Sequence, residues 1–247
     1  MAMRVVVAVA VMAVALPRPA HAYRPFDQTD ADTAELDTVE LELGPVKLTS
    51  GDQHLVYGPG GVFNYGFSKG WELVFDYDAS LPLANLGSSL VLTDLMVKHV
   101  IREGSLQEKS GPSVAIELGP LFPTLPTIDD EIGGSFAVIV SQHWNPLTIH
   151  VNAGVAWSRD RAIETTGGAI IEGPQAWRLR PVGEFYVSNE RGGNLYSALV
   201  GAIYRFRASL TFDAAVRIIK DDEDRTTMST NGTQSELRLG LTWVIPT

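Results

Sequence analysis

The chain has 247 residues, a formal net charge of −10 and no cysteine. An acidic protein is repelled by nucleic acids and by anionic lipid surfaces, so neither is expected as a partner, and the lack of cysteine excludes a disulfide framework. The hydrophobic share of 45% and the 23 glycines fit one domain of many short strands joined by turns.

The N-terminus has the features of a secretory signal peptide. Arg4 precedes an apolar run of twelve residues, 5–16, and the small-residue pattern AHA follows at 20–22. The run is too short for a membrane-spanning helix, which needs about 20 residues, and is typical of a segment that is cleaved off during export. We therefore expect three parts: a signal peptide (1–22), a periplasmic N-terminal segment (23–34) and an outer-membrane β-barrel (35–247). Because the signal peptide carries two arginines and no acid, its removal changes the net charge from −10 to −12.

Apolar and polar residues alternate through most of the remaining chain. In LTIHVNAGVAW (147–157), Ile149 and Val151 point one way, whereas His150 and Asn152 point the other. Such alternation predicts a strand with one apolar face, and segments of about 9 to 11 residues suit a tilted strand that crosses a bilayer. Eleven such strands are expected at about 36–43, 54–67, 70–78, 89–101, 113–120, 134–143, 147–157, 176–188, 195–206, 208–219 and 235–245.

Loop lengths indicate a twelfth strand. Bacterial outer-membrane barrels have an even number of strands, long external loops and short periplasmic turns. Eleven strands would put the tight turn at 206–208 outside and the long loop 220–234 inside, and a weak strand at 162–172 corrects both placements. We therefore predict an all-β fold, a closed antiparallel up-and-down transmembrane β-barrel of about twelve strands, with ten as the alternative. Pro59 and the glycines that flank it are expected to bend the second strand.

The polar faces of these strands carry acids and arginines at mid-strand, which is unusual for a soluble sandwich. A barrel lumen accepts such residues because they pair with one another or meet water. The predicted lumen charge network consists of Glu40, Glu72, Asp76, Asp94, Lys98, Glu117, Glu184, Arg205, Asp213, Arg217, Glu236 and Arg238. Glu42, Arg178 and Arg180 share the inward face, which then holds nine acids against six bases. The excess of carboxylates predicts a partly wet lumen that favours cations or neutral solutes over anions.

Aromatic residues near strand ends predict an interfacial girdle, because such rings gather where lipid meets water. The girdle is expected to contain Trp71, Tyr77, Trp144, Trp157 and Trp243. On pattern alone, aromatics at the edges of a soluble sandwich remain the alternative. The acidic loop segments at 129–131 and 221–224 lack the spacing of a calcium loop, so no metal and no cofactor is expected.

One arrangement raises the alternative of a barrel lipid hydrolase. Ser141 and His143 share a face, as do His150 and Asn152 on the next strand. A nucleophile needs a base within hydrogen-bond reach and a third group that orients the base. These residues are expected to face the lumen, however, whereas a site that cuts lipids should open to the bilayer. Hydrogen-bonded lumen residues are therefore favoured, no catalytic residue is assigned, and the chain is not expected to be an enzyme.

Six blocks of the chain, in their order, also resemble a known family of outer-membrane barrels. They are YRPFDQTDADTAE, FNYGFSKGWELVFDY, LTDLMVKHVI with its Asp94 to Lys98 spacing, GPSVAIELGPLFPT, LTIHVNAGVAW and PVGEFYV. The family is the meta-pathway phenol-degradation or transporter family, from which the chain departs by running on through 244–247 after Trp243. The resemblance implies a monomeric barrel, surrounded by outer-membrane lipid, that passes small hydrophobic or aromatic molecules. The predicted function is thus a channel or transporter in the bacterial outer membrane, with a lipid hydrolase or a structural or adhesive barrel as alternatives.

Overall fold

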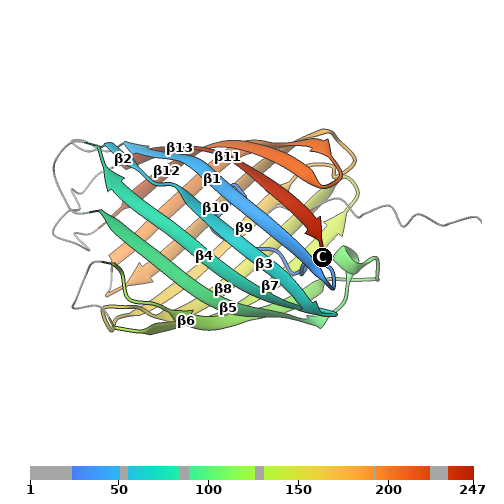
Figure 1. Cartoon of the computed structure of the whole chain (residues 1–247), viewed down its shortest axis with the longest axis horizontal. Helices are drawn as coiled ribbons and strands as arrows, with labels where there is room; N and C mark the ends of the chain where they lie inside the picture. Colours follow the sequence, from blue (N-terminus) through green and yellow to red (C-terminus); the bar gives the residue numbers. More distant parts are fainter. Residues whose placement is uncertain (1–23, 51–54, 84–88, 126–130, 192, 223–232) are drawn as a thin grey trace, which may run out of the picture.

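The chain folds into a closed β-barrel (Figure 1). The computed structural model describes residues 24–50, 55–83, 89–125, 131–191, 193–222 and 233–247. Its elements are β1 (Thr38–Ser50), β2 (Leu55–Tyr57), β3 (Gly60–Ser68), β4 (Trp71–Pro82), β5 (Leu90–Arg102), η1 (Ser105–Gln107), β6 (Ser113–Leu121), β7 (Gly133–Trp144), β8 (Leu147–Trp157), β9 (Ile163–Glu172), β10 (Leu179–Glu190), β11 (Gly193–Arg207), β12 (Leu210–Asp221) and β13 (Thr233–Pro246). Each strand pairs with its neighbours in antiparallel fashion, and β13 closes the sheet on β1.

The described residues form a barrel of twelve strands when β2 and β3 are counted as two parts of one strand. Both pair with β1 on one side and with β4 on the other. The strand is interrupted at Gly58 and Pro59, where the sequence predicted a bend, since proline has no N–H to donate to the ladder. The weak strand expected at 162–172 is present as β9 and pairs with β8 and β10 along its length. The prediction of a closed, twelve-stranded antiparallel barrel is confirmed.

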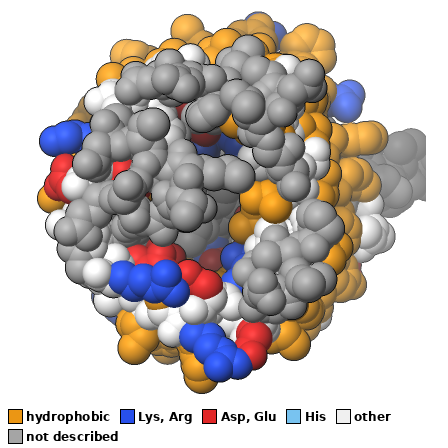
Figure 2. Space-filling model, turned by 90° about the vertical axis from the view of Figure 1, so that its left-hand side faces the viewer, with side chains coloured by type: hydrophobic (Ala, Val, Ile, Leu, Met, Phe, Trp, Pro, Cys, Tyr) orange, Lys and Arg blue, Asp and Glu red, His pale blue; other side chains and the backbone are white. Residues whose placement is uncertain are grey.

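Strict alternation gives every strand one outward and one inward face. In β8 the even-numbered Thr148, His150 and Asn152 are buried, whereas Val151 and Val155 on the opposite face are exposed. Hydrophobic side chains cover the outer wall (Figure 2). Closure of the sheet lets backbone donors and acceptors pair between strands, which is the condition for a β structure in lipid. Among the described residues, no helix has the length and apolar character needed to cross a membrane.

The two ends of the barrel differ in their connections. Two residues each link β3 to β4, β7 to β8 and β11 to β12, and these tight turns lie at the end where β1 begins and β13 finishes (Figure 1). The opposite end carries the longer connections 122–132 and 222–232. These connections follow the pattern from which the twelfth strand was predicted. Two others depart from it, because residues 103–112 between β5 and β6 form a long connection at the tight-turn end, and only two residues join β10 to β11 at the other end.

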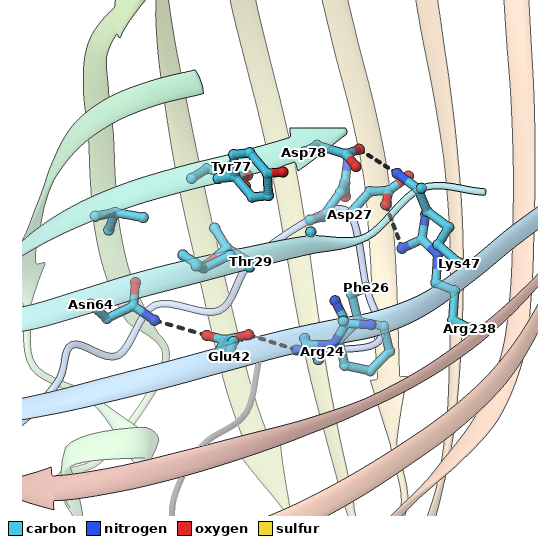
Figure 3. A pocket seen from close by; sticks show the side chains of 18 of the residues that line it. Arg24, Phe26, Asp27, Thr29, Glu42, Lys47, Asn64, Tyr77, Asp78 and Arg238 are labelled. Atoms are coloured by element: carbon cyan, nitrogen blue, oxygen red, sulfur yellow. Dashed lines mark hydrogen bonds and ion pairs between the residues drawn. The ribbon is translucent and has the colours of Figure 1, made fainter. Parts of the chain in front are cut away.

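The N-terminal segment lies at a place that the sequence did not predict. Residues 24–34, which belong to the segment 23–34 expected in the periplasm, run inside the barrel and contact its inward side chains (Figure 3). The physical reason is partly hydrophobic, because the inner face of β9–β12 carries an apolar patch that Phe26 covers. This patch consists of Ile170, Val182, Leu199, Ile203 and Ala215. Residues 24–34 are called the plug below.

Candidate functional site: the plugged lumen

One side of the lumen is dominated by buried arginines. We call the inward faces of β10, β12 and β13, with Arg180, Arg217 and Arg238, the arginine wall. Asp27 of the plug forms ion pairs with both Arg217 and Arg238, the latter at 2.6 Å between Oδ1 and Nη1. Arg217 also contacts Glu184 at 2.7 Å, and the same carboxylate accepts the N–H of Gln28 at 2.8 Å. Charge-assisted hydrogen bonds of this kind are stronger than neutral ones. They fix the plug against the arginine wall.

The middle of the plug crosses β7 and β8. The N–H of Ala31 donates to Ser141 Oγ at 2.8 Å, and Ser141 Oγ lies 2.8 Å from His150 Nδ1. Asn152 Nδ2 donates to the carbonyl of Thr29 at 2.8 Å. Ser141 is fully buried and His150 is 2% exposed. The Ser–His pair faces the lumen beneath the plug, as expected, and its hydroxyl hydrogen-bonds the plug backbone. No lipid in the bilayer could reach it.

The other side of the lumen is dominated by carboxylates. We call the inward faces of β1 and β3–β6, with Glu42, Glu72, Asp76 and Glu117, the carboxylate wall. Glu42 Oε2 accepts the N–H of Arg24 at 3.0 Å, and Glu72 Oε2 accepts the N–H of Ala34. Both carboxylates therefore bind the plug through its backbone.

Lys98 on β5 is the fully buried cation of this side. Its ammonium lies 3.5 Å from Asp30 of the plug and donates to Thr29 Oγ1 at 3.3 Å. In the strand register Lys98 stands opposite Glu72 on β4 and opposite Glu117 on β6. A cation so deeply buried requires carboxylates around it, and it has them on both neighbouring strands.

The remaining members of the predicted charge network are spread along the barrel. Glu40 lies two residues before Glu42 on the same face of β1, and Asp213 is 3.5 Å from Arg24. Glu236 pairs with Arg238 and accepts a hydrogen bond from Thr49 at 3.0 Å.

Other members lie near the ends of the barrel. Asp94 pairs with Arg159 of the β8–β9 loop. Arg205 donates to the carbonyl of Gln175 in the β9–β10 connection. The inward placement of Arg178 is wrong, because Arg178 precedes β10, is exposed at the rim and stacks over the ring of Tyr204, 5.3 Å from its centroid.

The five predicted girdle residues all point outward. Their exposed fractions run from 38% for Trp71 and Tyr77 to 62% for Trp157. Trp144 and Trp157 lie at opposite ends of β7 and β8, whereas Tyr77 lies within β4. Trp71 also stacks on His99, with ring centroids 3.9 Å apart. An interfacial role for these rings stays a prediction.

A cavity of about 310 Å³ remains between the plug and the carboxylate wall (Figure 3). The plug contributes Arg24 and Phe26, and the wall contributes a set of mostly acidic or small residues. Among the latter are Glu42, Gly58, Gly60, Asn64, Glu72, Asp76, Asp78 and Glu117. Seen from the end opposite the C-terminus, the molecule is hollowed, with charged side chains at the border of the hollow (Figure 2). Among the described residues, no group of His, Cys, Asp and Glu is arranged to hold a metal ion.

Comparisons with known proteins support the fold and go no further. No family model matches the chain, and no curated protein is recognisably related in sequence. The COG4313 outer membrane channel from Pseudomonas putida F1 is similar in structure, with a TM-score of 0.61 at 12% identity over 89% of this chain and 100% of that one. The NanC porin (TM-score 0.61) and the KdgM porin (0.56) are similar at 10% identity, each over 83% of this chain and 98% of its own. The chain thus has the fold of outer-membrane porins and channels.

The sequence contained one signal of the plug that the predictions did not use. Ile170, Leu199 and Ile203 point inward and are at most 2% exposed. Apolar side chains at these positions are unfavourable in a water-filled lumen. A row of inward apolar residues on adjacent strands would have indicated that a further segment covers them. It would not have identified the segment.

Proposed function

We propose that this protein is a channel of the bacterial outer membrane for small molecules. In this proposal the plug fills the lumen beside the arginine wall, and solutes pass along the carboxylate wall. The observation that carries it is the cavity of about 310 Å³ that the plug leaves beside that wall. The likeness in fold to porins and channels supports a pore over an enzyme or an adhesive barrel. The C-terminus and the tight turns would face the periplasm, and the barrel would be monomeric and surrounded by lipid.

The charge of the cavity indicates which solutes are favoured. Glu72, Asp76 and Glu117 border it. The basic residues of its lining, Arg24, Lys47 and Arg238, each form an ion pair with an acid, so the lining has an excess of carboxylates. A pore with an excess of one sign of charge concentrates ions of the other sign. The proposed solutes are therefore small cations or neutral molecules. The hydrophobic or aromatic solutes implied by the family resemblance would enter this set only if they are uncharged or cationic.

Ion selectivity in planar bilayers tests the proposal. With a salt gradient across the membrane, the reversal potential of the purified barrel should have the sign of a cation-selective pore. The Asp76→Asn variant should move the reversal potential toward zero, whereas Glu103→Gln, in the β5–β6 connection at the tight-turn end, should leave it unchanged. An anion-selective pore would contradict the charge argument. A barrel that inserts without conducting would instead support the structural alternative.

A further inference from the structure

Two buried acceptors border the cavity without a donor. Asn64 Nδ2 donates to Glu42 Oε1 at 2.8 Å, which turns the amide oxygen of Asn64 away from Glu42 (Figure 3). That oxygen has no hydrogen-bond partner, although Asn64 is only 1% exposed. Glu72 is likewise 1% exposed, and its Oε1 has no partner because only Oε2 accepts the N–H of Ala34. Buried polar atoms are nearly always hydrogen-bonded, so this pair of atoms calls for a donor from outside the chain.

The same region carries a carboxylate without a basic partner. Asp76 on β4 lines the cavity and stands opposite Asp94 on β5. Asp94 pairs with Arg159 and the neighbouring Asp78 pairs with Lys47, but Asp76 forms no ion pair within the described part of the chain. In the register of β3 and β4, Asp76 lies opposite Val62, and Val74 lies opposite Asn64. The unsatisfied acceptors and the unpaired charge thus belong to adjoining positions of two paired strands.

We propose that this cavity is a binding site for a small organic ammonium ion, with Glu72, Asp76 and Asn64 as its ligands. An ammonium group offers three N–H donors and one positive charge, which suits acceptors that point into a cavity from different positions. A bare metal ion fits less well because no described group of carboxylates converges on one point. Phe26, Val62 and Val74 also line the cavity and would contact an alkyl or aryl body. Volumes of roughly 300 Å³ and above are typical of small-molecule sites. This inference rests on the proposed function, since it names the class of solute that the channel would hold.

Calorimetric titration of the refolded full-length barrel in detergent tests the site. Benzylamine is the probe, and benzyl alcohol is its neutral analogue of nearly the same shape. Saturable binding of benzylamine is expected with a stoichiometry of one, and benzyl alcohol should bind at least tenfold more weakly. Equal affinity for the two compounds would overturn the ammonium assignment, and an absence of benzylamine binding would overturn the proposal.

Three variants locate the site. Asp76→Asn and Glu72→Gln should each weaken benzylamine binding tenfold or more, whereas Asp160→Asn, in the β8–β9 loop, should leave it unchanged. Val74→Trp adds an indole from the cavity wall and should abolish binding without removing any charge, which keeps the test valid if a carboxylate variant fails to fold. Benzylamine binding that survives all the cavity variants would overturn the location.

Conductance separates this inference from the function on which it rests. A cation-selective pore that binds no amine would support the channel function and contradict the ammonium site. A barrel that binds benzylamine but carries no current in bilayers would support the ammonium site and contradict the channel function.

Discussion

The arginine wall and the carboxylate wall of the lumen both carry charged side chains, but these charges are balanced in different ways. On the arginine wall, Arg217 is 1% exposed and meets two carboxylates, one from the plug and one from β10. On the carboxylate wall, Asp76 meets no basic side chain among the described residues and borders an open cavity. A buried charge needs a partner, whereas a carboxylate can stay unpaired where water reaches it. The path of the plug therefore determines where the cavity lies, because the acidic side chains of the plug pair with the buried cations of the barrel.

The strongest test of this difference introduces an arginine in place of a valine on each of three surfaces, in three separate variants. Val151→Arg on the lipid-facing side should destabilise the barrel by roughly 2 to 4 kcal/mol if it lies near the midplane. Val182→Arg on the arginine wall should also be severe, because Val182 packs in the apolar patch with Phe26 and the nearby acids Glu172 and Glu184 are already paired with Arg180 and Arg217. Val62→Arg on the carboxylate wall should be tolerated, since the new guanidinium faces Asp76 in the register. Folding yields in liposomes of the three variants measure the order, and equal tolerance would refute the assignment of the faces.

A bulky residue in the plug should separate the two walls functionally. Ala31 is fully buried against Ala115 and Ile139, so Ala31→Trp cannot be accommodated and should displace the plug. We expect a several-fold rise in single-channel conductance with the barrel still folded. Leu36→Trp is the control, because Leu36 is 56% exposed outside the plug. Unchanged conductance in Ala31→Trp would mean that the plug does not restrict the pore.

Removal of the carboxylate that bridges Arg217 and Arg238 should loosen the plug without expelling it. Loss of a buried ion-pair partner typically costs about 3 to 5 kcal/mol, and about 1 to 3 kcal/mol is expected for Asp27→Asn because the Asp27 side chain is 32% exposed. The chain has no cysteine, so a single Ala31→Cys reports on plug release through a charged thiol reagent. Labelling of this cysteine should speed up when Asp27→Asn is added. A Leu36→Cys probe should label at the same rate with and without Asp27→Asn.

A surface cluster outside both walls gives the smallest expected effect. Lys109 and Lys69 hold the pKa of Glu103 at about 2, below its ordinary value of 4.5, through ion pairs at 2.5 and 2.9 Å. Since the pKa is lowered in the folded state, this stabilisation is present above pH 4.5 and is lost as the pH falls toward 2. Glu103→Gln should therefore reduce, slightly, the loss of stability between pH 5 and about 2.5. Urea unfolding midpoints at the two pH values measure the change, and an identical acid response in both proteins would exclude this role for Glu103.

The barrel itself was predictable because its pattern is local. Alternation along LTIHVNAGVAW, the lengths of the loops and the requirement for an even strand count led to the strands that the structure contains, including β9. Each of these signals depends on residues that are close in sequence or on a rule about lipid, which offers no partner for backbone groups. The strand ends were less predictable. The first strand continues past a bulge near Gly44 to Ser50, and there the expected alternation breaks.

The sequence by itself determined the strands, the faces they present and the excess of acids on the inward side. Only the tertiary structure decided that residues 24–34 enter the lumen, because Asp27 meets Arg217 and Arg238 across about two hundred residues of chain. No periodicity links such positions. The plug pairs with some of the inward charges and leaves others beside a cavity, so the function of each carboxylate depends on where the plug runs. Alternation fixes the direction of a side chain because it is a property of the extended backbone, whereas its partner depends on the closure of the whole barrel.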